Sequence, residues 1–196
     1  MKNRLIIFIL FMISSPLLCA DTIYVCDTLF ELPVYWAESR IPDSILADIS
    51  ELAPLPPKYS VHGGRIYLLR PARDAFLEIA KAAEAAGLEF VIESGYRSIE
   101  KQEEIWCTLL GIGVPFESII KGTAPPGYSE HHTGRAVDFY PTTGDFVGTR
   151  EYWWLKRNAG KYGWRQSYTT GEGVRKEPWH WYFEDIKEII TISDSI

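Results

Sequence analysis

The chain has 196 residues, of which 46% are hydrophobic and 14% aromatic, and its formal net charge at pH 7 is -6. This length suits one domain, and the apolar share excludes disorder on a large scale because it supplies a sizeable core. The 20 basic residues form no stripe with interleaved aromatic side chains. Nucleic acid is therefore not an expected partner.

The segment 1–20 predicts a secretory signal peptide. Residues 1–4 are basic, residues 5–13 are continuously apolar, and Ala20 is a small residue at the expected cleavage site. A membrane anchor needs about 20 apolar residues, so we expect export to the periplasm, the cell wall or the medium without stable membrane insertion. The alternative is a lipoprotein cut before Cys19, although bulky residues precede it where small ones are usual.

Cleavage after Ala20 leaves two cysteines, Cys26 and Cys107. Oxidising compartments favour pairing, so an even number in an exported protein predicts a disulfide between them. The alternative is two buried free thiols that act as small apolar side chains.

Residues 21–58 contain several prolines, which break long elements. We expect an N-terminal arm that packs on the domain, with one short helix at 43–51. Residues 59–196 form the domain itself. There the pattern predicts a strand at 65–70, a helix at 71–86 that ends at Gly87, a strand at 88–93, and a helix at 99–110 capped by Ser98.

The second half of the domain contains more irregular segments. Residues 111–128 are rich in Gly and Pro and predict an irregular loop, followed by a strand at 136–140 and a hairpin or turn at 141–150. A helix at 151–159, strands at 164–168 and 179–183, and a C-terminal helix at 184–196 complete the chain. These elements predict a single small α+β domain with a central antiparallel sheet flanked by helices.

Two segments carry the chemistry. His131 and Asp138 stand seven positions apart, and His180 follows Glu177 by three. Two imidazoles and one carboxylate suit Zn²⁺ with one coordination position open, and a spare carboxylate could move a proton from bound water. A period of two puts Val137 on the core side and Asp138 on the opposite side. Pro178 cannot donate a ladder hydrogen bond, which places Glu177 on the turn entering the last strand.

Three further polar residues lie near these segments. Arg97 stands between a predicted strand end and a helix start, where a surface ion pair is the simple interpretation. Beside a zinc site, a fixed guanidinium aimed at developing negative charge explains it better. Gln102 falls near the buried side of the helix at 99–110, although most such residues are solvated. Ser129 taken alone is equally well a turn residue.

The segment from Ser129 to Asp138, the Glu177-Pro178-Trp179-His180 segment and the upstream Ser94-Gly95-Tyr96-Arg97-Ser98 together resemble the zinc D-alanyl-D-alanine carboxypeptidases of the VanY type. This family shares a fold group with lysostaphin-like enzymes and the amino-terminal domain of hedgehog proteins. The resemblance runs from about Tyr59 to Phe183. The chain departs from the family pattern after His180, where it has Trp181-Tyr182-Phe183 instead of x-Arg-Tyr, on the substrate side of that strand.

The resemblance implies a role for each residue of these segments. Zinc is bound by His131, Asp138 and His180, with His132 as the alternative to His131. Glu177 is the general base and then the general acid. Arg97 neutralises the oxyanion. Ser129 contacts the substrate, and Gln102 holds its terminal carboxylate.

The implied reaction removes the terminal D-alanine from peptidoglycan stem peptides, with Zn²⁺ as the cofactor and a monomer as the expected state. The alternatives within the enzyme class are an L,D-carboxypeptidase acting on tetrapeptides and an endopeptidase acting on cross-links. A zinc-stabilised binding module without turnover is the alternative of another class. The presence of Glu177 and Arg97 argues against that module.

Overall fold

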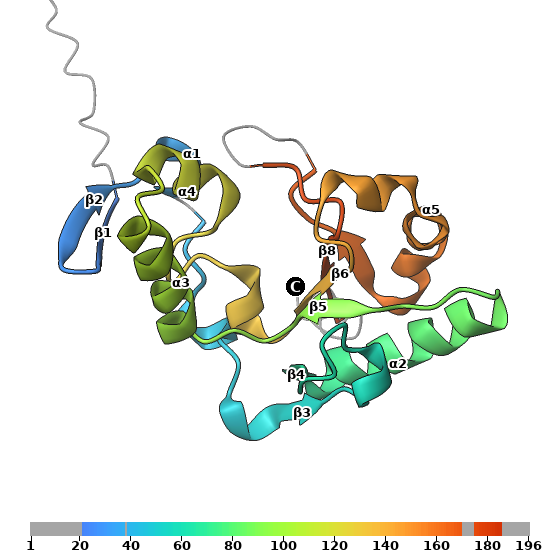
Figure 1. Cartoon of the computed structure of the whole chain (residues 1–196). Coiled ribbons are helices and arrows are strands. Elements are labelled where there is room, and N and C mark those ends of the chain that lie inside the picture. Colours follow the sequence, from blue (N-terminus) through green and yellow to red (C-terminus); the bar gives the residue numbers. More distant parts are fainter. Residues whose placement is uncertain (1–20, 38, 170–174, 186–196) are drawn as a thin grey trace, which may run out of the picture.

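The structure is a computed structural model, and it describes residues 21–37, 39–169 and 175–185. Its centre is a four-stranded sheet in the order β5 (Ile92–Ser94), β6 (Ala136–Phe139), β8 (His180–Phe183) and β7 (Trp164–Gln166). All neighbouring strands in this sheet are antiparallel. Helices flank the sheet on two sides (Figure 1). The predicted α+β domain with a central antiparallel sheet is therefore confirmed.

The larger core lies between this sheet and the helices α2 (Arg70–Ala85) and α5 (Arg150–Asn158). Val137 and Phe139 of β6 are buried in it, and Phe139 contacts Phe76 of α2. As predicted, α2 has a proline in its first turn and stops before Gly87, whose φ of 71° suits a residue without a side chain. This packing gives the strands a rigid apolar side.

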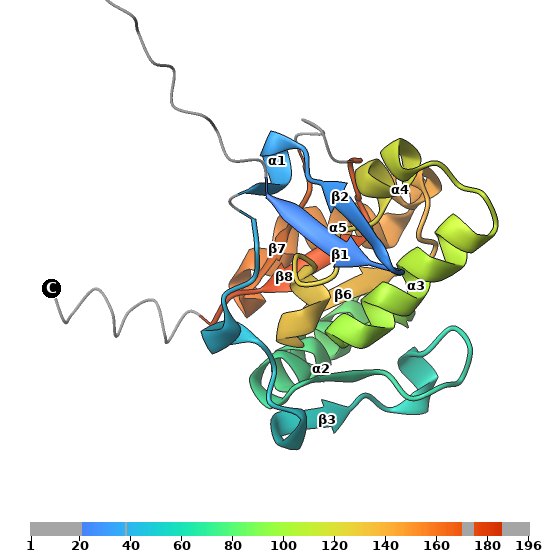
Figure 2. The same cartoon turned by 90° about the vertical axis from the view of Figure 1, so that its left-hand side faces the viewer.

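A second, smaller core lies on the other side of the molecule. It is built from β1 (Thr22–Val25), β2 (Thr28–Glu31), α1 (Val34–Ala37), α3 (Ile99–Gly111) and α4 (Phe116–Gly122). Figures 1 and 2 show the β1–β2 hairpin beside α3. A disulfide joins Cys26 of the hairpin to Cys107 of α3, with 5.5 Å between the Cα atoms. The predicted disulfide is confirmed.

A small two-stranded sheet packs on the larger core, in which Leu68 and Leu69 are buried. It consists of β3 (Leu52–Pro54) and β4 (Tyr67–Leu69), which are antiparallel. The 3-10 turns of the chain within the described residues are Asp43–Ile45, Ile49–Glu51, Pro57–Tyr59, Glu130–Thr133, Gly144–Gly148 and Ala159–Tyr162. No helix in the described part of the chain is long and apolar enough to span a membrane.

Two local predictions are wrong. The single helix expected at 43–51 is two 3-10 turns, the second of which is capped by Asp48. The loop expected at 111–128 contains α4, which starts after Pro115 and buries Ile119 and Ile120. The glycines and prolines on both sides of α4 favour a loop prediction, whereas the burial of Ile119 and Ile120 stabilises the helix.

Other boundaries differ by a few residues. The strand predicted at 88–93 is regular only from 92 to 94. Of the hairpin or turn predicted at 141–150, the structure has the turn, a 3-10 turn at Gly144–Gly148. The predicted signal peptide, most of the loop after Tyr168 and most of the C-terminal helix lie outside the described residues.

Candidate metal centre

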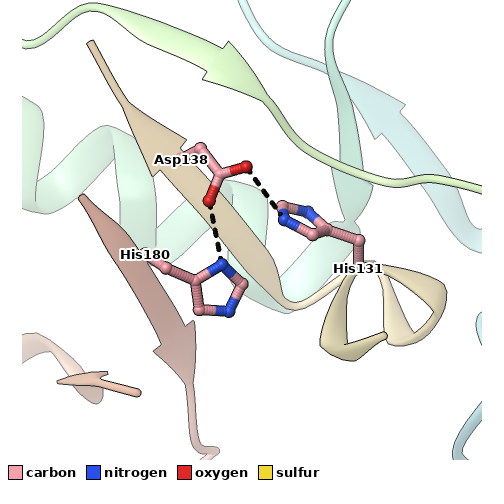
Figure 3. A group of neighbouring side chains, drawn as sticks. All are labelled: His131, Asp138 and His180. Atoms are coloured by element: carbon pink, nitrogen blue, oxygen red, sulfur yellow. Dashed lines mark hydrogen bonds and ion pairs between the residues drawn. The ribbon is translucent and has the colours of Figure 1, made fainter. Parts of the chain in front are cut away.

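Three elements bring His131, Asp138 and His180 together. Asp138 of β6 and His180 of β8 are direct register partners, so their side chains leave the sheet on the same face. His131 comes from the 3-10 turn that precedes β6. That turn ends at Gly134, whose φ of 66° allows the chain to bend into the strand. Figure 3 shows the three side chains converging from these elements.

The candidate ligand atoms lie close together in a buried position. Nε2 of His131 is 3.0 Å from Oδ2 of Asp138, and Nδ1 of His180 is 2.8 Å from Oδ1 of the same carboxylate. All three ligand atoms lie within 4.8 Å of one another. The exposed fractions are 4% for His131, 8% for Asp138 and 1% for His180.

The hydrogen bonds of His131 leave a lone pair facing the carboxylate. Its Nδ1 is 2.7 Å from the carbonyl oxygen of Gly95. A carbonyl oxygen only accepts, so Nδ1 carries the hydrogen. Burial outweighs the attraction of Asp138 and lowers the pKa of His131, which favours the neutral ring. Its Nε2 and the Asp138 oxygen are then two facing acceptors, an arrangement that a cation would satisfy.

The hydrogen bonds of His180 lead to the same conclusion. Its Nε2 lies 2.9 Å from Oε2 of Glu130, while its Nδ1 faces Asp138. A neutral imidazole has one N–H, so if Glu130 accepts from Nε2, a lone pair on Nδ1 points at Asp138. Metal-binding histidines commonly donate their second nitrogen to a carboxylate in this way, which fixes the tautomer. Glu130 is therefore the outer partner of His180.

The pKa shifts show how strongly this cluster attracts positive charge. Burial opposes protonation of His180, but its hydrogen bonds to Asp138 and Glu130 prevail and raise its pKa to about 10. Without a metal ion the ring therefore carries a proton on Nδ1, which a bound cation would displace. Burial also opposes ionisation of Asp138, yet the two imidazoles hold its pKa well below the usual range. A permanently ionised carboxylate between two imidazoles is a donor set that fits Zn²⁺.

His132 has a different role from its neighbour. Its Nε2 accepts from the backbone N–H of Gly127 at 3.1 Å, and its Nδ1 lies 2.7 Å from the carbonyl oxygen of Arg97. Both ring nitrogens are thus occupied by the backbone. The structure therefore favours His131 over His132 as the metal-binding residue and gives His132 a role in positioning Arg97.

Glu177 lies on the turn before β8, where the backbone N–H of His180 donates to its carbonyl oxygen at 3.0 Å. Its side chain lines a pocket of about 340 Å³ together with the three candidate ligands. Burial raises the pKa of Glu177 to about 7, against the opposing influence of His180. A carboxyl group with this pKa can accept and release a proton near neutral pH.

Arg97 lies in the same pocket and is held from two sides. Its Nη1 donates to Oε1 of Gln102 at 2.8 Å, and its Nη2 donates to Oγ of Ser94 at 2.8 Å. Its Nη2 is also 3.9 Å from Oδ2 of Asp138. These contacts fix a guanidinium beside the candidate metal position.

Gln102 and Ser129 also line this pocket. Gln102 is fully buried, with an exposed fraction of 0%. Its Nε2 donates to the carbonyl oxygen of Ala124 at 2.7 Å. Ser129 is buried too, and its Oγ accepts from the N–H of His131 at 3.3 Å, which caps the 3-10 turn. Both side chains therefore have clear structural contacts.

The opposite wall of the pocket comes from the smaller core. Trp36 of α1 lines the pocket, and its Nε1 donates to the carbonyl oxygen of Ile120 in α4 at 3.2 Å. Gly122 and Thr123 at the end of α4 line it as well. The pocket thus lies between the face of the sheet that carries the candidate metal ligands and the disulfide-linked region.

Comparison with known proteins identifies the family. Residues 65–186 match the family model described as VanY, D-alanyl-D-alanine carboxypeptidase. The chain belongs to this family. The VanY match covers β4 through β8 and so includes every residue of the candidate metal set, whereas the N-terminal arm precedes it.

The curated relatives of this VanY-type chain are longer. It is 29% identical over 127 residues to a D-alanyl-D-alanine carboxypeptidase of Enterococcus faecium, which covers 62% of this chain and 39% of that protein. It is 32% identical over 142 residues to the putative carboxypeptidase YodJ of Bacillus subtilis (strain 168), covering 66% of this chain and 50% of that protein. The matched part thus spans half or less of the relatives' length.

Solved structures show the same fold. VanYB in complex with D-alanine-D-alanine is 28% identical, with a TM-score of 0.56 and coverage of 80% of this chain and 87% of that chain. A vancomycin-resistance D,D-pentapeptidase VanY in complex with Zn(II) is 29% identical, with a TM-score of 0.55 and coverage of 79% and 88%. The LdcB LD-carboxypeptidase shares the fold, with a TM-score of 0.65 at 24% identity and coverage of 90% and 89%.

Sequence reasoning missed three residues of this site. Glu130 stands next to His131, but its contact with His180 depends on an approach between residues 50 positions apart. The sequence predicts Trp36 as a packing residue, and only the structure shows that it also lines the pocket. Arg175 lies two positions before Glu177, and nothing in the sequence marks it as part of the pocket.

Proposed function

We propose that this chain is an exported zinc carboxypeptidase that removes the terminal D-alanine from peptidoglycan stem peptides. The observation that carries the proposal is the buried set of His131, Asp138 and His180, in which a nitrogen of each imidazole lies 2.8–3.0 Å from the carboxylate, beside Glu177. Membership of the VanY family and the Zn(II) bound by a VanY structure support zinc as the metal. The disulfide supports an oxidising compartment.

Bound Zn²⁺ would supply the Lewis acidity that activates water and polarises a peptide carbonyl at neutral pH. Glu177 accepts the proton of the attacking water as the new carbon–oxygen bond forms. When the carbon–nitrogen bond breaks, Glu177 returns that proton to the leaving amine. Its pKa of about 7 suits both steps.

Arg97 stabilises the negative charge that develops on the attacked carbonyl oxygen. Its guanidinium is already held by Gln102 and Ser94, so little reorganisation is needed during the reaction. Removing one such donor typically costs on the order of 100-fold or more in rate. Ser129 contacts the substrate from the entrance to the turn that carries His131.

The test is mass spectrometry of pentapeptide and tetrapeptide muropeptides after incubation with the purified protein. One sample contains a chelator, and a second receives the chelator followed by zinc. We expect zinc-dependent loss of one terminal D-alanine from the pentapeptide. Loss from the tetrapeptide alone would identify an L,D-carboxypeptidase, and cleavage of cross-linked dimers would identify an endopeptidase.

The matched control is Glu177→Gln, which removes the base and keeps the size of the side chain. We expect it to lower turnover about 10³-fold while zinc content stays at the wild-type level. Stoichiometric zinc without cleavage of any of these substrates by the wild-type protein would contradict the proposal and favour a binding module.

A further inference from the structure

Two guanidinium groups line the pocket, and they differ in their contacts. Arg97 is engaged by Gln102, Ser94 and Asp138. Arg175 is exposed at the pocket. Among the residues that the structure describes, no side chain forms a hydrogen bond or ion pair with its guanidinium. One arginine is therefore fixed by the protein, and the other remains available to a ligand.

Two contacts place Arg175 beside the end of α4. Its backbone N–H donates to the carbonyl oxygen of Lys121 at 2.7 Å. Its guanidinium lies over Gly122, where an added Cβ would be 3.4 Å from both Cζ and Nη2. This distance is an ordinary van der Waals contact, so the guanidinium packs against the end of α4. The arginine side chain is placed within the pocket wall instead of extending away from it.

The remaining charges of the pocket explain why such a group is useful. The carboxylate of Asp138 belongs to the candidate metal set, and Arg97 is engaged by other side chains. Glu177 lines the same pocket and, when ionised, would repel a substrate that carries a carboxylate. The charge of Arg175 already acts on Glu177, because it is among the influences that lower the pKa of that residue against the larger effect of burial. A guanidinium with no side-chain partner among the described residues offers two parallel N–H donors, which match a carboxylate.

Gln102 is poorly placed to bind a carboxylate by itself. Its amide oxygen already accepts from Arg97, and its amide nitrogen already donates to Ala124. The side chain is fully buried. Gln102 therefore acts as a positioning residue for Arg97, and a peptide with a free carboxylate needs another partner.

We propose that Arg175 binds a carboxylate of the peptide substrate and thereby selects peptides with a free acid at this point. The inference rests on the proposed function and adds a specificity-determining residue to it. Two carboxylates have this chemistry: the terminal carboxylate of the leaving residue and the side-chain carboxylate of a diamino acid within the stem peptide.

Equilibrium binding separates these sources. Calorimetry on zinc-loaded Glu177→Gln, whose slow turnover leaves time to measure binding, compares three pentapeptides. The first has a free C-terminal acid and a diamino acid with a free side-chain carboxylate, the second is C-terminally amidated, and the third contains Lys in place of the diamino acid. Binding of each peptide is then measured to a double variant that carries Arg175→Gln as well as Glu177→Gln. The matched control carries Arg157→Gln instead, at an exposed arginine away from the pocket.

We expect Arg175→Gln to weaken binding of the first peptide about tenfold to a hundredfold, as for a lost hydrogen bond to a charged group. A loss that disappears on the amide assigns Arg175 to the terminal carboxylate. A loss that disappears on the Lys peptide assigns it to the side-chain carboxylate. Arg175→Lys should recover part of the affinity, because it restores the charge without the two parallel donors.

An equal loss on all three peptides, or no loss on any, would overturn the inference. Peptide binding is measured apart from turnover, so the two proposals can fail separately. If the wild-type protein trims muropeptides and the Arg175→Gln variant binds peptides normally, only the role of Arg175 is contradicted. A protein that neither binds nor trims any of the peptides contradicts both proposals.

Discussion

The two cores of the molecule support the pocket in different ways. The sheet side rests on α2 and α5 through a large apolar cluster, and its strands β6 and β8 carry Asp138 and His180 in register. The other side is a smaller cluster of the arm, α3 and α4, held by one disulfide. The candidate metal ligands lie on the side with the larger apolar cluster. The opposite wall, which includes Trp36, belongs to the cluster that the disulfide cross-links.

The largest expected effect is a loss of stability on removal of the disulfide, which should leave the metal site on the sheet side unchanged. The disulfide closes a loop with a sequence separation of 81, and removing it with Cys26→Ser and Cys107→Ser together should cost about 4 kcal/mol of unfolding free energy. Urea unfolding measures this loss. Zinc affinity under native conditions, measured by competition with a chelator, should not change because no ligand lies in the smaller core. A parallel loss of zinc affinity would show that the two sides are not independent.

A smaller effect on stability should come from Glu177 on the sheet side. Its pKa is about 7 in the folded protein and 4.5 as the ordinary value. The folded state therefore binds this proton more tightly than the unfolded state does. The resulting contribution to the free energy of unfolding is fully present below pH 4.5 and is lost as the pH rises through 7. In the metal-free protein, Glu177→Gln should be more stable than wild type by about 3 kcal/mol at pH 8.

At pH 4 this difference should vanish, since Glu177 is then protonated in both the folded and unfolded wild-type chains. Chemical denaturation at the two pH values in the presence of chelator measures it. Glu78→Gln, at an exposed position on α2, is the matched control. Equal stability of Glu177→Gln and wild type at both pH values would mean that burial does not penalise this carboxylate.

The smallest effect concerns the outer partner of His180. Glu130→Gln removes the charge that fixes the His180 tautomer, and such changes typically lower metal affinity about tenfold to a hundredfold. Chelator competition measures the change, with Glu104→Gln in an exposed ion pair on α3 as the control. Unaltered zinc affinity in Glu130→Gln would show that Asp138 orients the ring without help from Glu130.

The sequence predicts the regular parts of the fold well. The helices α2 and α3 follow from apolar periodicity and from their end signals at Gly87 and Ser98. It does not predict the β1–β2 hairpin. The turn residues Cys26 and Asp27 have φ values of 51° and 59°, whereas such turns usually contain Asn-Gly or Asp-Gly. Packing and the disulfide hold an arrangement that local preference does not indicate.

For the site, the sequence by itself determined the identities and spacing of His131, Asp138, His180 and Glu177, because strand alternation and a proline-containing turn fix their directions locally. Only the tertiary structure decided which side chains surround them. The contact of Glu130 with His180 and the place of Arg175 over Gly122 depend on how distant segments pack. Strand register and burial set these distances, and neither is encoded in the neighbouring residues alone.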